Sequence, residues 1–99
     1  MTKFRTTRLA DQDIVDIYVD SAARFGEIQA DRYFAGLKRT FAVLADNPRI
    51  ARERREFAPP VRVHPYGVHL VVFCEDDAGI LIVRVLHGRR EWEDCLTEE

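Results

Sequence analysis

Two long stretches with a helical repeat of apolar residues, joined at a single glycine, constrain the fold of this chain most strongly. In the first stretch, apolar and small residues recur at offsets of three, four and seven, at Ala10, Ile14, Ile17, Tyr18, Ser21 and Phe25. Asp13, Asp16 and Asp20 turn away from that face. The second stretch, Glu27 to Asp46, repeats the pattern at Ala30, Tyr33, Phe34, Leu37, Phe41 and Leu44.

The ends of both stretches carry residues that start or stop helices. Thr7 is suited to cap the first helix, because its hydroxyl can accept a hydrogen bond from an otherwise unpaired backbone N–H. Gly26 ends the first helix and Asn47-Pro48 ends the second. Two helices joined this tightly are predicted to form an antiparallel hairpin.

The rest of the chain has the composition of short strands. Strands are predicted at Lys3 to Thr6, Val61 to His64, Val68 to Glu75 and Ile80 to His87. Residues 49–60 follow neither period and end in Pro59-Pro60, so we expect a charged connecting loop there. The pattern predicts one α+β domain over residues 1–99. In it, an N-terminal strand precedes an antiparallel helical hairpin packed on one face of a small, mainly antiparallel sheet, and a short helical tail follows.

The last two strands are apolar on both faces. A turn with an even number of residues places Glu75 opposite Ile80 and so defines which side chains share a face. One face then holds Val68, Leu70, Val72, Cys74, Leu81, Val83 and Val85, and we expect the hairpin to cover it. The other holds Val71, Phe73, Ile82 and Leu86 beside His69, Arg84 and Glu75. Because the solvated side of an antiparallel sheet is normally polar, we expect a protein partner there; self-association or a different register is the alternative.

Charge is unevenly distributed, although the formal net charge is only −2. Acids dominate residues 11–32 and arginines dominate residues 49–62. A nucleic-acid-binding protein is more often basic overall, so the arginines are interpreted either as a solvated loop or as a contact for an acidic partner. Cys74 and Cys95 form no metal-binding spacing, and Cys74 is expected to be a small core residue. With no apolar run of membrane-spanning length, we expect a cytoplasmic protein that needs no cofactor or metal.

Three parts of the chain resemble ParE-type toxins of bacterial toxin–antitoxin pairs. The first helix carries Ala10, Asp13, Ile14, Asp16, Ile17 and Tyr18. The second carries Ala30-Asp31-Arg32-Tyr33 and Leu44-Ala45-Asp46-Asn47-Pro48. The last strands carry Gly67 to Phe73 and Ile80 to Arg90, in which Arg-Val-Leu-His-Gly-Arg-Arg is the most specific signal. The resemblance implies the β-α-α-β-β-β fold of the wider RelE and ParE superfamily.

The two branches of that superfamily differ in chemistry. The RelE-like branch cleaves messenger RNA on the ribosome, which requires a base, an acid and cations, typically from lysines, arginines and a late tyrosine. Here the only lysines are Lys3 and Lys38, every tyrosine precedes the last strand, and residues 91–95 contain three acids. The ParE-like branch acts against DNA gyrase and is neutralised by an antitoxin that wraps a partly disordered segment across the toxin.

We therefore favour a non-enzymatic toxin that binds gyrase. The alternatives are a ribosome-dependent endoribonuclease that uses His87 and Arg89, and a toxin-like fold that has lost toxicity. Contacts with gyrase are assigned to Arg84, Arg89, Arg90 and Trp92. Contacts with a ParD-like antitoxin, in a hetero-oligomer, are assigned to Ile14, Tyr18, Tyr33, Leu37, His69, Val71, Phe73, Ile82 and Leu86. Structural roles compete with these: His87 as a hydrogen-bonded strand end, Arg89 and Arg90 as a solvated pair, and Trp92 as an anchor for the tail.

Overall fold

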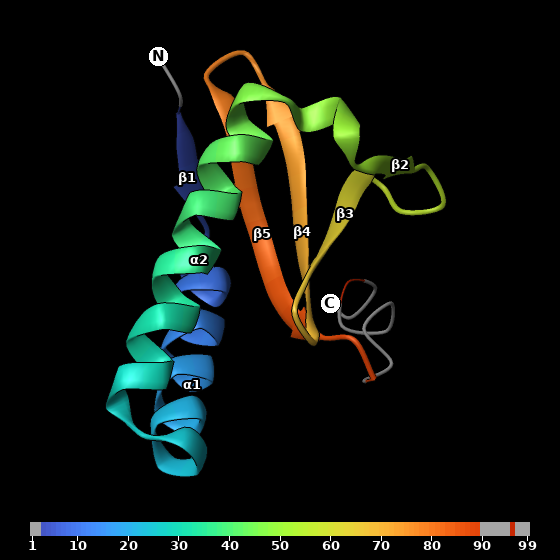
Figure 1. The fold of residues 1–99 in the computed structure, drawn as a ribbon. Coiled ribbons are helices and arrows are strands. Elements are labelled where there is room, and N and C mark those ends of the chain that lie inside the picture. Colours follow the sequence, from blue (N-terminus) through green and yellow to red (C-terminus); the bar gives the residue numbers. More distant parts are fainter. Residues whose placement is uncertain (1–2, 90–95, 97–99) are drawn as a thin grey trace.

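A helical hairpin packed on one face of a five-stranded sheet forms the fold (Figure 1). The computed structural model describes residues 3–89 and residue 96. In chain order the elements are β1 (Phe4–Thr6), α1 (Arg8–Phe25), α2 (Glu27–Asp46), the 3-10 turn η1 (Pro48–Ile50), β2 (Arg52–Arg54), β3 (Val61–Tyr66), β4 (His69–Asp76) and β5 (Gly79–His87). The sheet order is β1-β5-β4-β3-β2, with only β1 and β5 parallel. The α+β prediction is confirmed; the predicted helical tail lies outside the described residues except for Leu96.

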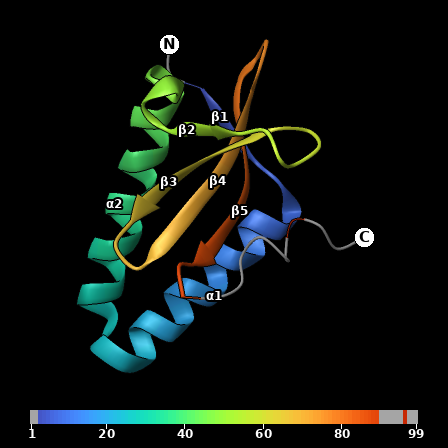
Figure 2. The same ribbon diagram turned by 90° about the vertical axis from the view of Figure 1, so that its right-hand side faces the viewer.

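The helical hairpin begins and ends where the sequence predicts. Thr7 caps α1, because its Oγ1 accepts a hydrogen bond from the backbone N–H of Ala10 at 3.0 Å. At the other end, the Gly26 N–H donates to the carbonyl of Ala22, and α2 starts at the next residue. The two helices lie side by side over the same side of the sheet, as the views in Figures 1 and 2 both show. No described helix is long and apolar enough to cross a membrane.

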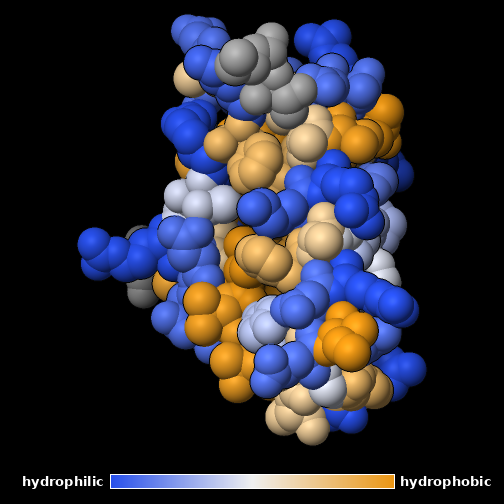
Figure 3. All heavy atoms as spheres, turned by 60° about the vertical axis from the view of Figure 1, so that its left-hand side comes forward, coloured by the Kyte–Doolittle hydropathy of each residue, from blue (hydrophilic) through white to orange (hydrophobic). Residues whose placement is uncertain are grey.

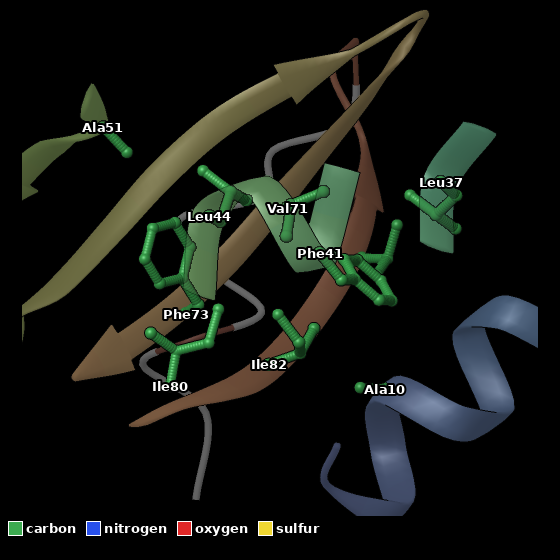
Figure 4. Packing of buried hydrophobic residues seen from close by; sticks show 10 residues of the cluster. Ala10, Leu37, Phe41, Leu44, Ala51, Val71, Phe73, Ile80 and Ile82 are labelled. Atoms are coloured by element: carbon green, nitrogen blue, oxygen red, sulfur yellow. The ribbon is translucent and has the colours of Figure 1, made fainter. Parts of the chain in front are cut away.

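The face of the sheet that the helices cover is the opposite of the one predicted. Side chains of Val71, Phe73, Ile80, Ile82 and Val85 pack with Leu37, Phe41 and Leu44 of α2 in the main core (Figure 4). The prediction assigned Val68, Leu70, Val72, Cys74, Leu81 and Val83 to this core, and it was wrong because both faces are apolar and periodicity alone does not say which one the helices take.

A β-bulge also divides the register between β4 and β5. Glu75 pairs with Ile80 and Phe73 with Ile82, as predicted, but Val72 pairs with Arg84, so Val83 is an extra residue on β5. Beyond this bulge the faces exchange. Val85 therefore joins the helix-covered core, as predicted, although the neighbours it was predicted to share that face with lie on the other side.

The second face of the sheet is covered in part by the chain itself. Phe57, Val61, Val72 and Leu86 form a second buried cluster. Leu96, Val63, Leu70 and Val83 pack against it. The segment between β2 and β3 thus places Phe57 on the face of Leu70, Val72 and Val83, which the sequence analysis assigned to the helical hairpin.

Strand β2 is the one described strand that sequence reasoning missed. Arg52–Arg54 lies inside the stretch predicted as a charged loop, yet it pairs antiparallel with residues Val61 to Val63 of β3. Strand pairing uses backbone groups, which every residue carries, so a three-residue edge strand needs no apolar alternation.

Candidate partner-binding site

A cluster of two tyrosines and two histidines lies where the hairpin meets the end of the sheet. The Tyr33 hydroxyl of α2 lies 2.7 Å from Nδ1 of His69 on β4 and 3.0 Å from the carbonyl oxygen of Tyr66 on β3. In return, the Tyr66 hydroxyl donates to the Tyr33 carbonyl at 3.0 Å. The ring of His87, the last residue of β5, lies 5.5 Å from the ring of His69. Four elements that are separate in sequence therefore meet here.

Two glycines make this cluster possible. A Cβ on Gly36 would lie 2.0 Å from the Tyr66 hydroxyl oxygen, so only glycine lets that hydroxyl reach α2. Gly67, in the β3–β4 turn, has φ +57°, and a Cβ there would lie 2.5 Å from the Tyr33 hydroxyl. Neither glycine stood out from the sequence as part of a site, because the tyrosine that each one admits comes from a distant segment.

The cluster is electrically neutral at pH 7 in its buried part. Burial raises the pKa of Tyr33 above its usual value, so this side chain remains a phenol. Burial, followed by the charge of nearby His87, lowers the pKa of His69 and favours its neutral form. Since the Tyr33 hydroxyl donates its one proton to the Tyr66 carbonyl, Nδ1 of His69 is the donor to the Tyr33 oxygen. These neutral groups join α2 to the sheet through hydrogen bonds and add no charge there.

Beside the cluster lies an open cleft of about 440 Å³ between α1, the start of α2 and the β3–β4 turn. Its lining comprises Ile17, Asp20, Ser21, Arg24, Phe25, Gln29, Tyr33, Gly67, Val68, His69 and His87. Phe25 and Val68 at its rim are 67% and 60% exposed, which is a large apolar surface to leave in water. The helices carry further exposed apolar side chains among charged ones, namely Leu9, Val15, Val19, Ile28 and Val43 (Figure 3).

Arg84, predicted to contact the target, is held inside the molecule. Its Nε and Nη2 donate to the two carboxylate oxygens of Asp13 at 2.7 and 3.0 Å, and these side chains are only 16% and 13% exposed. The sequence pattern placed Asp13 on the solvated side of α1, and this was wrong. Its carboxylate also accepts the backbone N–H of Val85 at 3.0 Å.

The hydrogen bond from Val85 to Asp13 compensates for the early end of strand β1. Strand β1 pairs with β5 only as far as Ile82, so the following residues of β5 have lost their neighbour on that side. Thr7 takes over by donating from its N–H to the Ile82 carbonyl and from its hydroxyl to the Val83 carbonyl. Asp13 then satisfies the next exposed donor, so the start of α1 continues the edge of the sheet.

The remaining predicted gyrase contacts lie at or beyond the end of the described strand. Arg89 is exposed, and its backbone N–H donates to Nδ1 of His87 at 3.1 Å. His87 thereby has the structural role that the sequence suggested as its alternative. Arg90 and Trp92 lie outside the described residues.

Burial divides the predicted antitoxin contacts into two groups. Leu37, Val71, Phe73, Ile82 and Leu86 are at most 2% exposed. They have no surface to present to a partner in this conformation, so these five assignments are corrected to core positions. Ile14, Tyr18, Tyr33 and His69 are half-buried and remain candidates. Of these, Tyr18 links the two helices of the hairpin, because its hydroxyl donates to Asp31 of α2 at 2.6 Å.

The arginine-rich stretch is largely neutralised by neighbouring acids. Arg54 pairs with Glu56, Arg55 with Glu53, and Arg62 with Glu75. Within residues 3–89 and 96, no group of three or more histidines, cysteines, aspartates or glutamates has the arrangement of a metal site.

Comparisons with known proteins agree with one another. Residues 4–92 match the family model described as the ParE toxin of the type II toxin–antitoxin system parDE. The chain is 32% identical over 87 residues to Toxin ParE1 of Caulobacter vibrioides, and the match covers 88% of this chain and 90% of that protein. Its fold is similar to a solved structure titled as a chromosomal ParDE TA system from P. aeruginosa, with a TM-score of 0.74, 20% identity, and coverage of 88% of this chain and 96% of the other.

Proposed function

Because the chain belongs to the ParE toxin family of type II toxin–antitoxin systems, we propose that it inhibits DNA gyrase by binding to it and that a ParD-like antitoxin neutralises it. The observation that supports this most is that the family match extends over nearly the whole chain, including both candidate surfaces. The toxin acts by contact rather than catalysis, without a cofactor, and in the cytoplasm, where gyrase works.

The gyrase contact is proposed for the end of β5 and the residues after it. Arg89 is exposed there, directly after the hydrogen-bonded end of the strand. Arg90 and Trp92 follow in sequence, and Arg and Trp are the residue types most enriched among those that dominate binding energy. Arg84 has a different part in this proposal, since its guanidinium is engaged by Asp13 and serves to position strand β5, which ends two residues before Arg89.

The antitoxin contact is proposed for the helical hairpin and the cleft beside it. Exposed apolar side chains cover both helices, and Phe25 and Val68 extend this surface to the cleft rim. The contacts proposed for Ile14, Tyr18, Tyr33 and His69 are retained here. Covering such a surface is worth about 25 cal/mol per Å² of apolar area, before the cost of ordering the antitoxin segment.

Two assays separate this function from its alternative. Purified toxin is added to a gyrase supercoiling reaction and, separately, to translating ribosomes. We expect loss of supercoiling and intact messenger RNA, with Arg89→Ala weakening the inhibition and Arg55→Ala, in the β2–β3 loop, serving as the matched control. Ribosome-dependent cleavage with unaffected supercoiling would assign the chain to the nuclease branch, and harmless high-level expression of the chain alone would exclude both.

A further inference from the structure

The cleft beside the tyrosine–histidine cluster has a shape and a charge that point to one kind of side chain. We propose that this cleft binds a single arginine side chain of a partner protein. The assignment of that arginine to the antitoxin rests on the function proposed above. The binding preference itself rests on the cleft.

The cleft can hold a side chain that is apolar along its length. Its volume of about 440 Å³ lies within the range of small-ligand sites, and Ile17, Phe25 and Val68 supply apolar surface. The rings of Tyr33 and His69, 5.6 Å apart between centroids, complete the wall on the side of the sheet. A long aliphatic stem can pack here against Phe25 and Val68 and along the rings of Tyr33 and His69, whose polar atoms already hydrogen-bond each other.

The charge beside the cleft is negative. An adjoining hollow of about 180 Å³ shares Ile17, Asp20, His69 and His87 with the cleft and adds Asp13 and Asp16. Asp13 is paired with Arg84 and Asp20 with Arg24, so the exposed carboxylate of Asp16 gives the junction its net negative charge. Arg24 is the one lysine or arginine among the residues that line the two spaces. A cation is therefore attracted to this junction and a phosphate or carboxylate is repelled.

The chain's own Arg24 shows how a guanidinium sits at this rim. Its Nε lies 3.0 Å from Oδ1 of Asp20, one helical turn earlier, with both side chains about two-thirds exposed. Such an exposed pair is weak, so an incoming guanidinium can displace it. Arginine suits the cleft better than lysine, because its planar group stacks on aromatic and imidazole rings and meets a carboxylate with two donors.

The test uses the full-length ¹⁵N-labelled chain and N-acetyl-arginine-N-methylamide as the probe. We expect saturable amide shifts at Gly67, Val68 and His69 with a dissociation constant in the millimolar range, as for a small ligand. The matched probes are the citrulline analogue, which has the same shape without the charge, and the glutamate analogue. We expect the citrulline analogue to bind at least about threefold more weakly and the glutamate analogue not to bind.

Variants of the rim test the charge directly. Asp20→Asn should weaken binding of the arginine probe about two- to fivefold, and Arg24→Ala, which removes the internal competitor, should strengthen it. Asp77→Asn, an exposed acid in the β4–β5 turn, is the matched control and should change nothing. All three sites are exposed, and the dispersion of each amide spectrum checks folding.

Equal binding of the arginine and citrulline probes would overturn the proposal, as would amide shifts outside the cleft or an Asp20→Asn variant that binds unchanged. Neither gyrase nor toxicity enters this test. The arginine site can therefore fail while the toxin function stands, and the toxin function can fail while the arginine site stands.

Discussion

Replacing Arg84 by alanine removes two charge-assisted hydrogen bonds and leaves the carboxylate of Asp13 with its backbone partner, the N–H of Val85. Removing one partner of a buried ion pair costs about 3–5 kcal/mol. Since Arg84 and Asp13 keep 16% and 13% of their side-chain surface in water, we expect a smaller loss, about 2–3 kcal/mol of unfolding free energy.

That loss is large for a chain of this size. A total unfolding free energy on the order of 5–15 kcal/mol is usual for about 100 residues. The Arg84–Asp13 ion pair would therefore contribute a substantial share of the stability of this chain. The melting temperature should fall by about 10–20 °C. Urea denaturation followed by circular dichroism measures the free energy directly, and an unchanged denaturant slope would show that the folded state is still reached.

Two further variants test whether the effect is specific to the Arg84–Asp13 ion pair. Arg84→Lys keeps the charge but loses the paired geometry, so we expect about half of the alanine effect. Arg55→Ala removes an arginine that is 84% exposed, and it should cost no more than about 0.5 kcal/mol. An Arg84→Ala variant as stable as Arg55→Ala would refute the reasoning, because it would show that water solvates the Asp13 carboxylate as well as Arg84 does.

Three other outcomes follow from the structure. First, the folded-state pKa of His69 lies below its ordinary value of 6.5 through burial and nearby His87, so the unfolded chain binds more protons and the unfolding free energy should decrease as pH falls below 6.5. Denaturation at several pH values should show a shallower dependence for His69→Asn, and an identical slope would contradict this. Second, Gly67→Ala should destabilise the chain by about 1–3 kcal/mol, because φ is +57° and the new Cβ meets Tyr33; a neutral effect in thermal melts would show that the turn relaxes freely. Third, Phe57→Ala should lower the unfolding free energy by about 2–3 kcal/mol and expose the second apolar cluster. Binding of a hydrophobic dye should then increase, and unchanged dye binding would show that Phe57 does not shield this cluster from water.

The helical hairpin could be predicted because its information is local. Thr7 caps the first helix, Gly26 separates the two helices, and Asn47 ends the second. Within both helices the apolar residues repeat with the helical period. The strands on either side of the β4–β5 turn were predicted for the same reason, including the pairing of Glu75 with Ile80. The run of residues 84–90 likewise indicated the family that the comparisons show.

The candidate site could not be predicted to the same extent. The cleft brings together Asp20, Tyr33, Val68 and His87 from four segments of the fold, namely α1, α2, the β3–β4 turn and β5. Sequence reasoning named Tyr33 and His69 as contacts but had no signal that a hydrogen bond joins them. It also placed Arg84 on a target surface, because the sequence carries no sign that Asp13 would reach it across 71 positions.

Local order was thus determined by the sequence alone, through periodicity and the residues that begin and end each element. Which side of the sheet the helices cover was decided only in three dimensions. Both sides of β4 and β5 are apolar, and in the structure the helices pack on the side of Phe73 and Ile82 while Phe57 covers part of the other side. A pattern along one strand states which residues share a face, but only packing against the other layer states what that face contacts.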